Sequence, residues 1–187
     1  MRAIVVGRAR GALEEYSAAC SLGDFDCVIV VGKMLVSFPH RVDHVASFHA
    51  ELFDGWAARR ARACLPPAAC YWGATYKGRN LGQKVTKASP LKYVKCVGGS
   101  SGLLATEGVA LGALGAHRVV LAGVPMLASA GHEGDATGRP WDEADRYWAT
   151  WEEYLPQLLG RVRSMSGRTR DALGEPTRKW LIHGEGL

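Results

Sequence analysis

The sequence lacks the features of several protein classes. Its apolar runs fall far short of the roughly 18–20 residues that a membrane-spanning helix needs, so we expect no membrane span. The apolar stretch after Met1 ends at Gly7, too early for the core of a signal peptide. The 5 cysteines form no CxxC pair, which favours reduced, mostly buried thiols over a disulfide framework or a zinc site. We therefore expect a cytoplasmic protein with no metal site.

The composition is that of an ordinary folded protein without internal repeats. Of its 187 residues, 48% are hydrophobic and 22% are charged, and the net charge is +5. The length predicts a single domain, residues 1–187, in which 168–187 form a short helix and tail. Glycine is in excess, with 23 residues or about 12%, against a usual value near 7%. No collagen-like period accompanies these glycines, so their positions in the fold become the main question.

Short apolar runs alternate with helical stretches along the chain. A helix over 50–65 carries Arg59, Arg60 and Arg62 in its last turns, where cations complement the helix dipole. Residues 76–90 read as a glycine- and lysine-rich loop. This alternation predicts a three-layer α/β fold with a mainly parallel sheet of about six to seven strands. We expect strands at 3–7, 27–32, 42–48, 68–72, 93–97, 118–123 and 161–165, and the other main helices at 13–20, 103–114 and 141–159.

In such a fold ligands bind beyond the carboxyl ends of the strands, so the residues directly after each strand matter most. The first strand is followed by the turn Gly7-Arg8-Ala-Arg-Gly11, whose amides and arginines could hold a phosphate or simply form a tight turn. The fifth strand is followed by Gly98-Gly99-Ser100-Ser101-Gly102, which opens a helix. These small residues favour close approach of a ligand, although helix capping and packing would also explain them.

Two histidines follow strands and are candidates for acid–base chemistry. His49 comes after the third strand, with Glu51 two residues on, and His132 lies in a polar loop after Gly123-Val-Pro-Met126. A histidine suits proton transfer because its ordinary pKa lies near neutrality. Both could equally be surface histidines.

Charge is unevenly spread. From Tyr76 to Lys95 the sequence carries no acidic residue, whereas the cations include Lys77, Arg79 and Lys84. A basic segment beside a glycine-rich strand end suits a polyphosphate or nucleotide ligand. Together with the arginines of 161–179 it could also contact nucleic acid, and simple solvation remains open. The aromatic helix 141–159 would pack on the sheet or on a partner subunit, which is compatible with a homo-oligomer.

The residues from Val97-Gly-Gly-Ser-Ser-Gly to Leu114-Gly-Ala-His-Arg-Val-Val-Leu-Ala-Gly-Val-Pro-Met126 resemble the second nucleotide-binding motif of sialyltransferase-like proteins. The same pattern occurs in motility-associated glycosyltransferase-like proteins and in hydroxymethylpterin diphosphokinases. The resemblance covers roughly residues 1–135, and its specific part is the block Gly98–Met126. It implies that His132 takes the place of the family's catalytic histidine. It also implies nucleotide contacts from Gly7, Arg8, Gly98, Ser100, Ser101 and Gly102.

A second resemblance ranks below the first. Gly98-Gly-Ser-Ser-Gly102 with Thr106-Glu107 is similar to the PGGxGTxxE motif of lysine-decarboxylase-like phosphoribohydrolases. In that family the glutamate would act on a ribosyl bond.

Together these observations predict a Rossmann-like protein that binds a nucleotide or nucleotide sugar. We expect a transferase moving a glycosyl or pyrophosphoryl group to a hydroxyl, with His132 or His49 as the base. A magnesium ion could accompany the phosphates. The alternative is a non-catalytic protein of phage or prophage type that binds nucleic acid or a larger assembly. The remaining site residues are Gly11 and Gly99 at the nucleotide, and Lys77, Arg79 and Met126 at the substrate.

Overall fold

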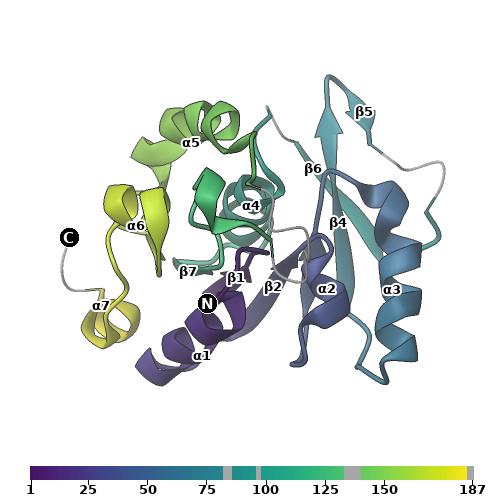
Figure 1. Ribbon diagram of the computed structural model, residues 1–187, viewed down its shortest axis with the longest axis horizontal. Helices are drawn as coiled ribbons and strands as arrows, with labels where there is room; N and C mark the ends of the chain where they lie inside the picture. Colours follow the sequence, from purple (N-terminus) through teal and green to yellow (C-terminus); the bar gives the residue numbers. More distant parts are fainter. Residues whose placement is uncertain (82–85, 96–97, 133–139, 185–187) are drawn as a thin grey trace.

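The structure is a computed structural model that describes residues 1–81, 86–95, 98–132 and 140–184. It is a mixed α/β fold built on a mostly parallel 8-stranded sheet, with helices on both faces (Figure 1). Lys84, Cys96 and Val97 lie outside the described residues. The sequence-based prediction of an α/β fold with a mainly parallel sheet is thus confirmed.

The strands lie in the order β5-β4-β3-β2-β1-β7-β8, and β6 pairs with β4. Every pair is parallel except β4 with β5. The prediction of six to seven strands is corrected to eight, because β5 is a two-residue strand inside the segment that we read as a loop. The bounds are β1 Arg2–Val6, β2 Cys27–Val31, β3 His44–Ala46, β4 Cys70–Tyr76, β5 Arg79–Asn80, β6 Leu91–Lys95, β7 Arg118–Ala122 and β8 Val162–Ser164.

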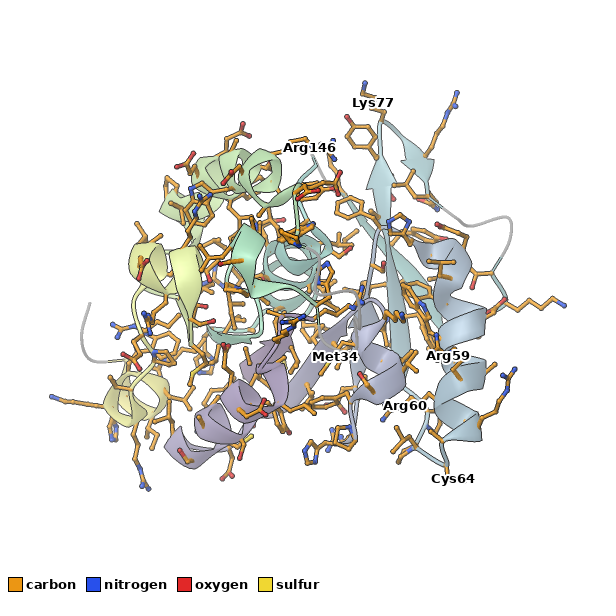
Figure 2. The ribbon with its side chains drawn as sticks, viewed as in Figure 1. Met34, Arg59, Arg60, Cys64, Lys77 and Arg146 are labelled. Carbon is orange, nitrogen blue, oxygen red and sulfur yellow. The ribbon has the colours of Figure 1, made fainter. Side chains whose placement is uncertain are left out.

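The helices depart from the prediction in three places. The four-residue α2, which begins at Met34 (Figure 2), is too short to show a helical period in the sequence. The C-terminal region holds two helices where we expected one, and 104–113 is wound as a π-helix. The bounds are α1 Ala12–Leu22, α2 Met34–Ser37, η1 Ala50–Leu52, α3 Phe53–Arg62, α4 Ser101–Leu103, η2 Leu104–Ala113, η3 Ala128–Ala130, α5 Ala144–Leu158, α6 Gly167–Leu173 and α7 Arg178–His183.

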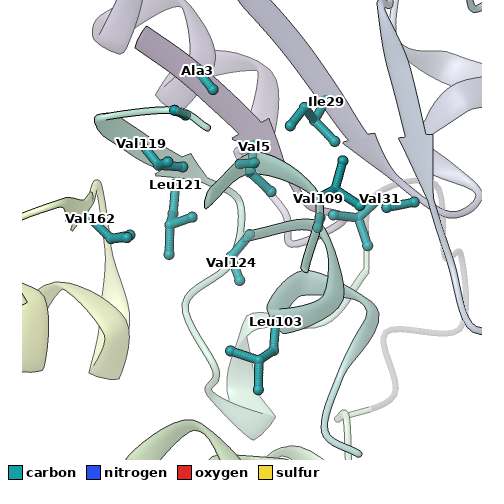
Figure 3. Packing of buried hydrophobic residues seen from close by; sticks show 14 of the residues in the cluster. Ala3, Val5, Ile29, Val31, Leu103, Val109, Val119, Leu121, Val124 and Val162 are labelled. Atoms are coloured by element: carbon teal, nitrogen blue, oxygen red, sulfur yellow. The ribbon is translucent and has the colours of Figure 1, made fainter. Parts of the chain in front are cut away.

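Successive side chains of a strand point to opposite faces of the sheet, so the core divides into two hydrophobic clusters, one on each face. Ile4 of β1 and Val30 of β2 face a layer formed by α1, α2, α3 and α7. Val5, Ile29 and Leu121 face the opposite layer, formed by η2, α5 and α6 (Figure 3). Because both faces are covered, the central strands read as continuous apolar runs in the sequence.

Arg60 of α3 is buried, with 1% of its surface exposed (Figure 2). Its guanidinium donates to the carbonyl oxygens of Leu35 at 2.8 Å, Phe38 at 2.7 Å and His40 at 2.8 Å, and also to that of Pro66. Burial lowers the pKa of Arg60, and the nearby Tyr71 acts in the opposite direction. Arg60 lies in the last turn of α3, as predicted, but it does more than complement the helix dipole: its guanidinium ties α3 to the end of α2 by donating to backbone carbonyls.

No helix among the described residues is long and apolar enough to cross a membrane. Cys27 and Cys70 are buried free thiols, as expected, whereas Cys20 and Cys64 are exposed. The expectation of mostly buried cysteines thus holds for only part of the set.

Replacing Arg60 tests its structural role. Arg60→Met leaves buried carbonyl oxygens without donors and should lower the free energy of unfolding by about 3–5 kcal/mol, measured by urea denaturation. The neighbouring Arg59 is exposed, so Arg59→Met should change it by less than about 0.5 kcal/mol. Equal effects of the two substitutions would contradict the assignment.

Candidate functional site

The carboxyl ends of β1 and β7 approach each other unusually closely. Gly7 donates its N–H to the carbonyl of Ala122 at 2.7 Å, and Ala9 donates to the carbonyl of Gly123 at 3.1 Å. A Cβ on Gly7 would overlap the Gly123 carbonyl, and one on Gly123 would overlap Ala12. Both glycines are therefore required by packing. Strand order also reverses at this point, because β2, β3 and β4 lie on one side of β1 and β7 lies on the other.

A cavity of about 590 Å³ opens at this edge of the sheet. It is lined by the segments that follow β1, β2, β3 and β7, by residues 99–102, and by residues 141–147 at the start of α5. The volume lies within the range of roughly 300–1,000 Å³ typical of small-molecule sites. Open α/β sheets bind their ligands at such a reversal of strand order.

Two cations line the cavity directly after strand-end glycines: Arg8 after Gly7 and Lys33 after Gly32. Arg8 was predicted, but Lys33 was missed. The rule that selected the other strand ends would have found Lys33, since it follows the second strand at once. Gly32 adopts a φ of +54°, which favours glycine, and it lies against Trp56 and Ser47.

The first turn is not an open phosphate cradle. The backbone N–H groups of Gly7, Ala9 and Arg10 all donate to carbonyl oxygens of the protein. That of Arg10 donates to Ala130 at 3.4 Å. Gly11, with a φ of +78°, is the N-cap of α1 and does not line the cavity. The Glu15 carboxylate accepts the N–H of Gly123 at 2.7 Å and so ties α1 to the end of β7. Of this turn, Gly7, Arg8 and Ala9 line the cavity, and Arg8 supplies its charge.

The two serines of the second turn have different partners. The Ser100 hydroxyl oxygen accepts from the Leu103 N–H at 3.3 Å and from Trp151 Nε1 at 3.1 Å, and it donates to Met126 Sδ at 3.9 Å. Ser100 is thus the helix cap and an anchor for α5, which leaves it little capacity for a ligand. Ser101 Oγ accepts from the Phe48 N–H at 3.2 Å and keeps its own proton available for donation into the cavity.

The glycines of this turn serve packing as well. A Cβ on Gly102 would lie 3.0 Å from Val124, and one on Gly99 would lie 3.2 Å from Thr150. Gly99 and Gly102 line the cavity, whereas Gly98 does not. The continuous helix of α4 and η2 begins here, so its N-terminal end faces the cavity through Ser101 and Gly102. Such an end attracts anions.

Both candidate histidines line the cavity. His49 Nδ1 lies 3.0 Å from Glu51 Oε1, and its backbone N–H donates to Ser47 Oγ at 3.0 Å. An ionised carboxylate can only accept, so this contact favours a proton on Nδ1, and Nε2 is an acceptor whenever the ring is neutral. His132 lies beside Trp141, with ring centroids 5.9 Å apart. Glu51 follows His49 by two residues in the sequence, and through its contact with Nδ1 its carboxylate orients the His49 ring.

Aromatic side chains form two walls that the sequence analysis did not assign to a ligand. Phe48 and Trp56 contribute to one wall, and Trp141 and Tyr147 to the other, with the latter pair of ring centroids 5.6 Å apart. Glu143 stands at this second wall, where its carboxylate accepts the Tyr147 hydroxyl at 3.2 Å. The spacing of Trp141 and Tyr147 indicated a helix that packs on the sheet, so the sequence did not reveal that these two residues also line the cavity.

Met126 lines the cavity in a strained backbone conformation. Its φ is +52°, rare for a side chain of this size, and 2% of its surface is exposed. Its sulfur accepts the Ser100 hydroxyl, so the strained turn after β7 and the glycine-rich turn after β6 meet at this contact. Observed strain of this kind is a common mark of functional sites.

Other predicted site residues lie elsewhere. Lys77 and Arg79 belong to the β4–β5 hairpin, and neither lines the cavity. Glu107 is half-buried in η2 and also does not line it, although burial raises the pKa of its carboxyl group. Two arginines of the segment 161–179 donate to backbone carbonyls, Arg161 to Ala116 and Arg163 to Glu175, and Arg118 donates likewise to Leu181.

Within the described ranges, no group of three or more His, Cys, Asp or Glu side chains is arranged to hold a metal ion. Comparisons with protein-family models, curated proteins and solved structures found no match to this chain. Function must therefore be inferred from the residues of the cavity itself.

The two serines provide a matched test of the site. Ser100→Ala removes the helix cap and leaves buried Trp151 Nε1 without its acceptor, so the free energy of unfolding should fall by about 1–3 kcal/mol. Ser101→Ala loses one partly exposed acceptor and should cost less than about 1 kcal/mol. Urea denaturation of both variants measures the difference. A larger loss for Ser101→Ala would contradict these roles.

Proposed function

We propose that the protein is a Rossmann-like transferase that binds a nucleotide or nucleotide sugar and moves its glycosyl or pyrophosphoryl group to a hydroxyl acceptor. The observation that carries this proposal is the cavity at the reversal of strand order, where Arg8 and Lys33 stand beside glycine turns and aromatic side chains form the walls. Apolar walls with a few cations suit a ligand that has both a base and phosphates.

The phosphates would lie over the glycine turns. Arg8 and Lys33 supply positive charge there, and Ser101 can donate a hydrogen bond at the helix end. These groups would stabilise the negative charge that develops on the departing phosphate. A magnesium ion carried by the donor would be held by the donor's own phosphates, since the described residues offer no acidic cluster for it.

The base and sugar of the donor would lie against the aromatic walls. Trp141, Tyr147 and Trp56 present flat apolar surface, on which a nucleobase can stack. The Glu143 carboxylate at the same wall is an acceptor of the type that binds ribose hydroxyls. The cavity therefore offers a nucleotide both cations for its phosphates and aromatic surface for its base.

His49 is the stronger candidate for the general base, because Glu51 holds its tautomer. The acceptor oxygen would form a bond to the transferred carbon or phosphorus while the bond from that atom to the departing phosphate breaks. The phosphate leaves with the electron pair, and the acceptor proton passes to His49 Nε2. His132, on the Trp141 side, is placed to contact the acceptor or the leaving group.

The two alternatives receive less support. A phosphoribohydrolase would need Glu107 at the ligand, and Glu107 does not line the cavity. The non-catalytic alternative, in which the basic segment 76–95 and the C-terminal arginines contact nucleic acid or a larger assembly, gives the cavity no role, because no described residue of either segment lines it.

Nucleotide binding is tested by thermal shift against CMP, UDP, GDP, ATP and AMP. At about 100 times its dissociation constant, a bound nucleotide stabilises by roughly 2.7 kcal/mol and should raise the melting temperature by roughly 5–10 °C. Arg8→Ala and Lys33→Ala should each weaken binding roughly 10- to 100-fold, and Ser101→Arg should abolish the shift.

Arg62→Ala is the matched control, because Arg62 is exposed on α3 and does not line the cavity. It should leave the shift unchanged. If no nucleotide raises the melting temperature, or if Arg62→Ala weakens binding as much as Arg8→Ala, the proposed site is wrong.

Catalysis is tested on the donor that binds. His49→Ala should slow turnover roughly 10²- to 10⁴-fold while the thermal shift persists, because the base acts on the acceptor. Glu51→Gln should slow turnover less than His49→Ala, since it disturbs only the orientation of the ring. The turnover rate of His132→Ala, measured in the same way, tests whether the second histidine takes part. Unchanged rates in His49→Ala and His132→Ala together would remove both from the mechanism.

A further inference from the structure

The β4–β5 hairpin has no part in the cavity, yet it is a well-defined projection of the sheet (Figure 1). It stands at the carboxyl end of β4, with Lys77 at its tip (Figure 2). The Leu81 N–H donates to the Ala74 carbonyl at 2.9 Å, and the Thr75 hydroxyl donates to Asn80 Oδ1 at 2.6 Å. These bonds hold the hairpin in a fixed shape.

The tip carries a lysine where the backbone disfavours one. Lys77 has a φ of +47° and Gly78 a φ of +75°, the two positive values of a type I′ turn. Asparagine, aspartate or glycine is the usual residue at the first of these positions. Lys77 makes the turn less stable than asparagine would, so the turn itself does not explain its presence. Its ammonium group lies 5.4 Å from the centre of the Tyr76 ring.

The surroundings of the tip are basic and exposed. Arg79 and Lys95 are exposed, as are Lys87 and Lys92 farther from the tip, and no acidic residue occurs from Tyr76 to Lys95. Lys95 pairs with Thr75 across β6 and β4, so it lies at the same end of β4 as the tip.

The Asp54 side chain of α3 contacts this segment at its base. The Asp54 carboxylate of α3 is engaged by the Lys87 N–H at 2.7 Å and by the Thr86 hydroxyl at 3.1 Å, at the base of the segment. Positive charge therefore dominates the end that carries Lys77 and Arg79.

We propose that the β4–β5 hairpin binds single-stranded nucleic acid, with Lys77, Arg79 and Lys95 at phosphates and a base stacked on Tyr76. The ring of Tyr76 belongs to a residue that is 38% exposed, which offers a stacking surface beside the cations. Exposed aromatic rings interleaved with cations are typical of surfaces for single strands. An acidic peptide would use the cations and leave Tyr76 unused.

The experiment is fluorescence anisotropy of a labelled 12-nucleotide oligo-dT with the full chain at 50 and 200 mM salt. Lys77→Asn removes the charge and places the favoured residue in the turn, so binding should weaken roughly 3- to 10-fold while the melting temperature stays equal or rises. The slope of log affinity against log salt should shrink by about 0.7. Tyr76→Leu should weaken binding roughly 5- to 100-fold. Arg62→Asn, the same loss of charge on α3, should change nothing.

The proposal fails if oligo-dT does not bind at 50 mM salt, or if Lys77→Asn and Arg62→Asn behave alike. It also fails if polyglutamate or vesicles with anionic headgroups compete as well as unlabelled oligo-dT, because the surface would then recognise charge alone. The nucleotide shift of the cavity should survive in Lys77→Asn, so a failure at either site leaves the other test intact.

Discussion

The contact between the ends of β1 and β7 is the constraint on which the cavity depends. Gly7 and Gly123 meet there without side chains, and hydrogen bonds from Gly7 to Ala122 and from Ala9 to Gly123 join the two strand ends. The Glu15 carboxylate holds the Gly123 amide from α1. This junction lies where the strand order reverses, and the segments that follow β1 and β7 both line the cavity.

Helices α5 and α6, on the same face of the sheet as η2, hold the segment that follows this junction. The Thr169 hydroxyl of α6 donates to the Val124 carbonyl at 2.6 Å, and Arg168 donates its N–H to Pro125 at 2.9 Å. Trp151 of α5 holds Ser100, which in turn contacts Met126. The strained Met126 is thus surrounded by fixed partners, which is the condition under which such strain persists. A cavity supported in this way is preorganised for its ligand.

Cations in this protein have distinct tasks, and their number alone does not reveal them. Arg60, Arg118 and Arg161 bind backbone carbonyls and hold segments of the fold together. Arg8 and Lys33 line the cavity, whereas the cations of the β4–β5 hairpin are exposed. Aromatic residues divide similarly: Trp151 is buried in the core, while Trp141 and Tyr147 line the cavity. A net charge of +5 therefore combines structural and surface contributions.

The sequence by itself determined the layers and the sheet edge of the site, because β1, β2 and β7 are apolar on both faces and end in glycine. Local patterns carry that information. The short α2 and β5 were not predicted because segments of four and two residues are too short to show a periodic pattern, and nothing in the sequence signalled the π-helical winding of η2. Residue roles were decided by tertiary contacts. Only the fold buries Arg60 among carbonyls, commits Ser100 to Trp151, and brings Lys33 and Trp141 to one cavity. Spacing along the chain shows which residues can share a face, but the partner of a polar group depends on which segments the sheet brings together.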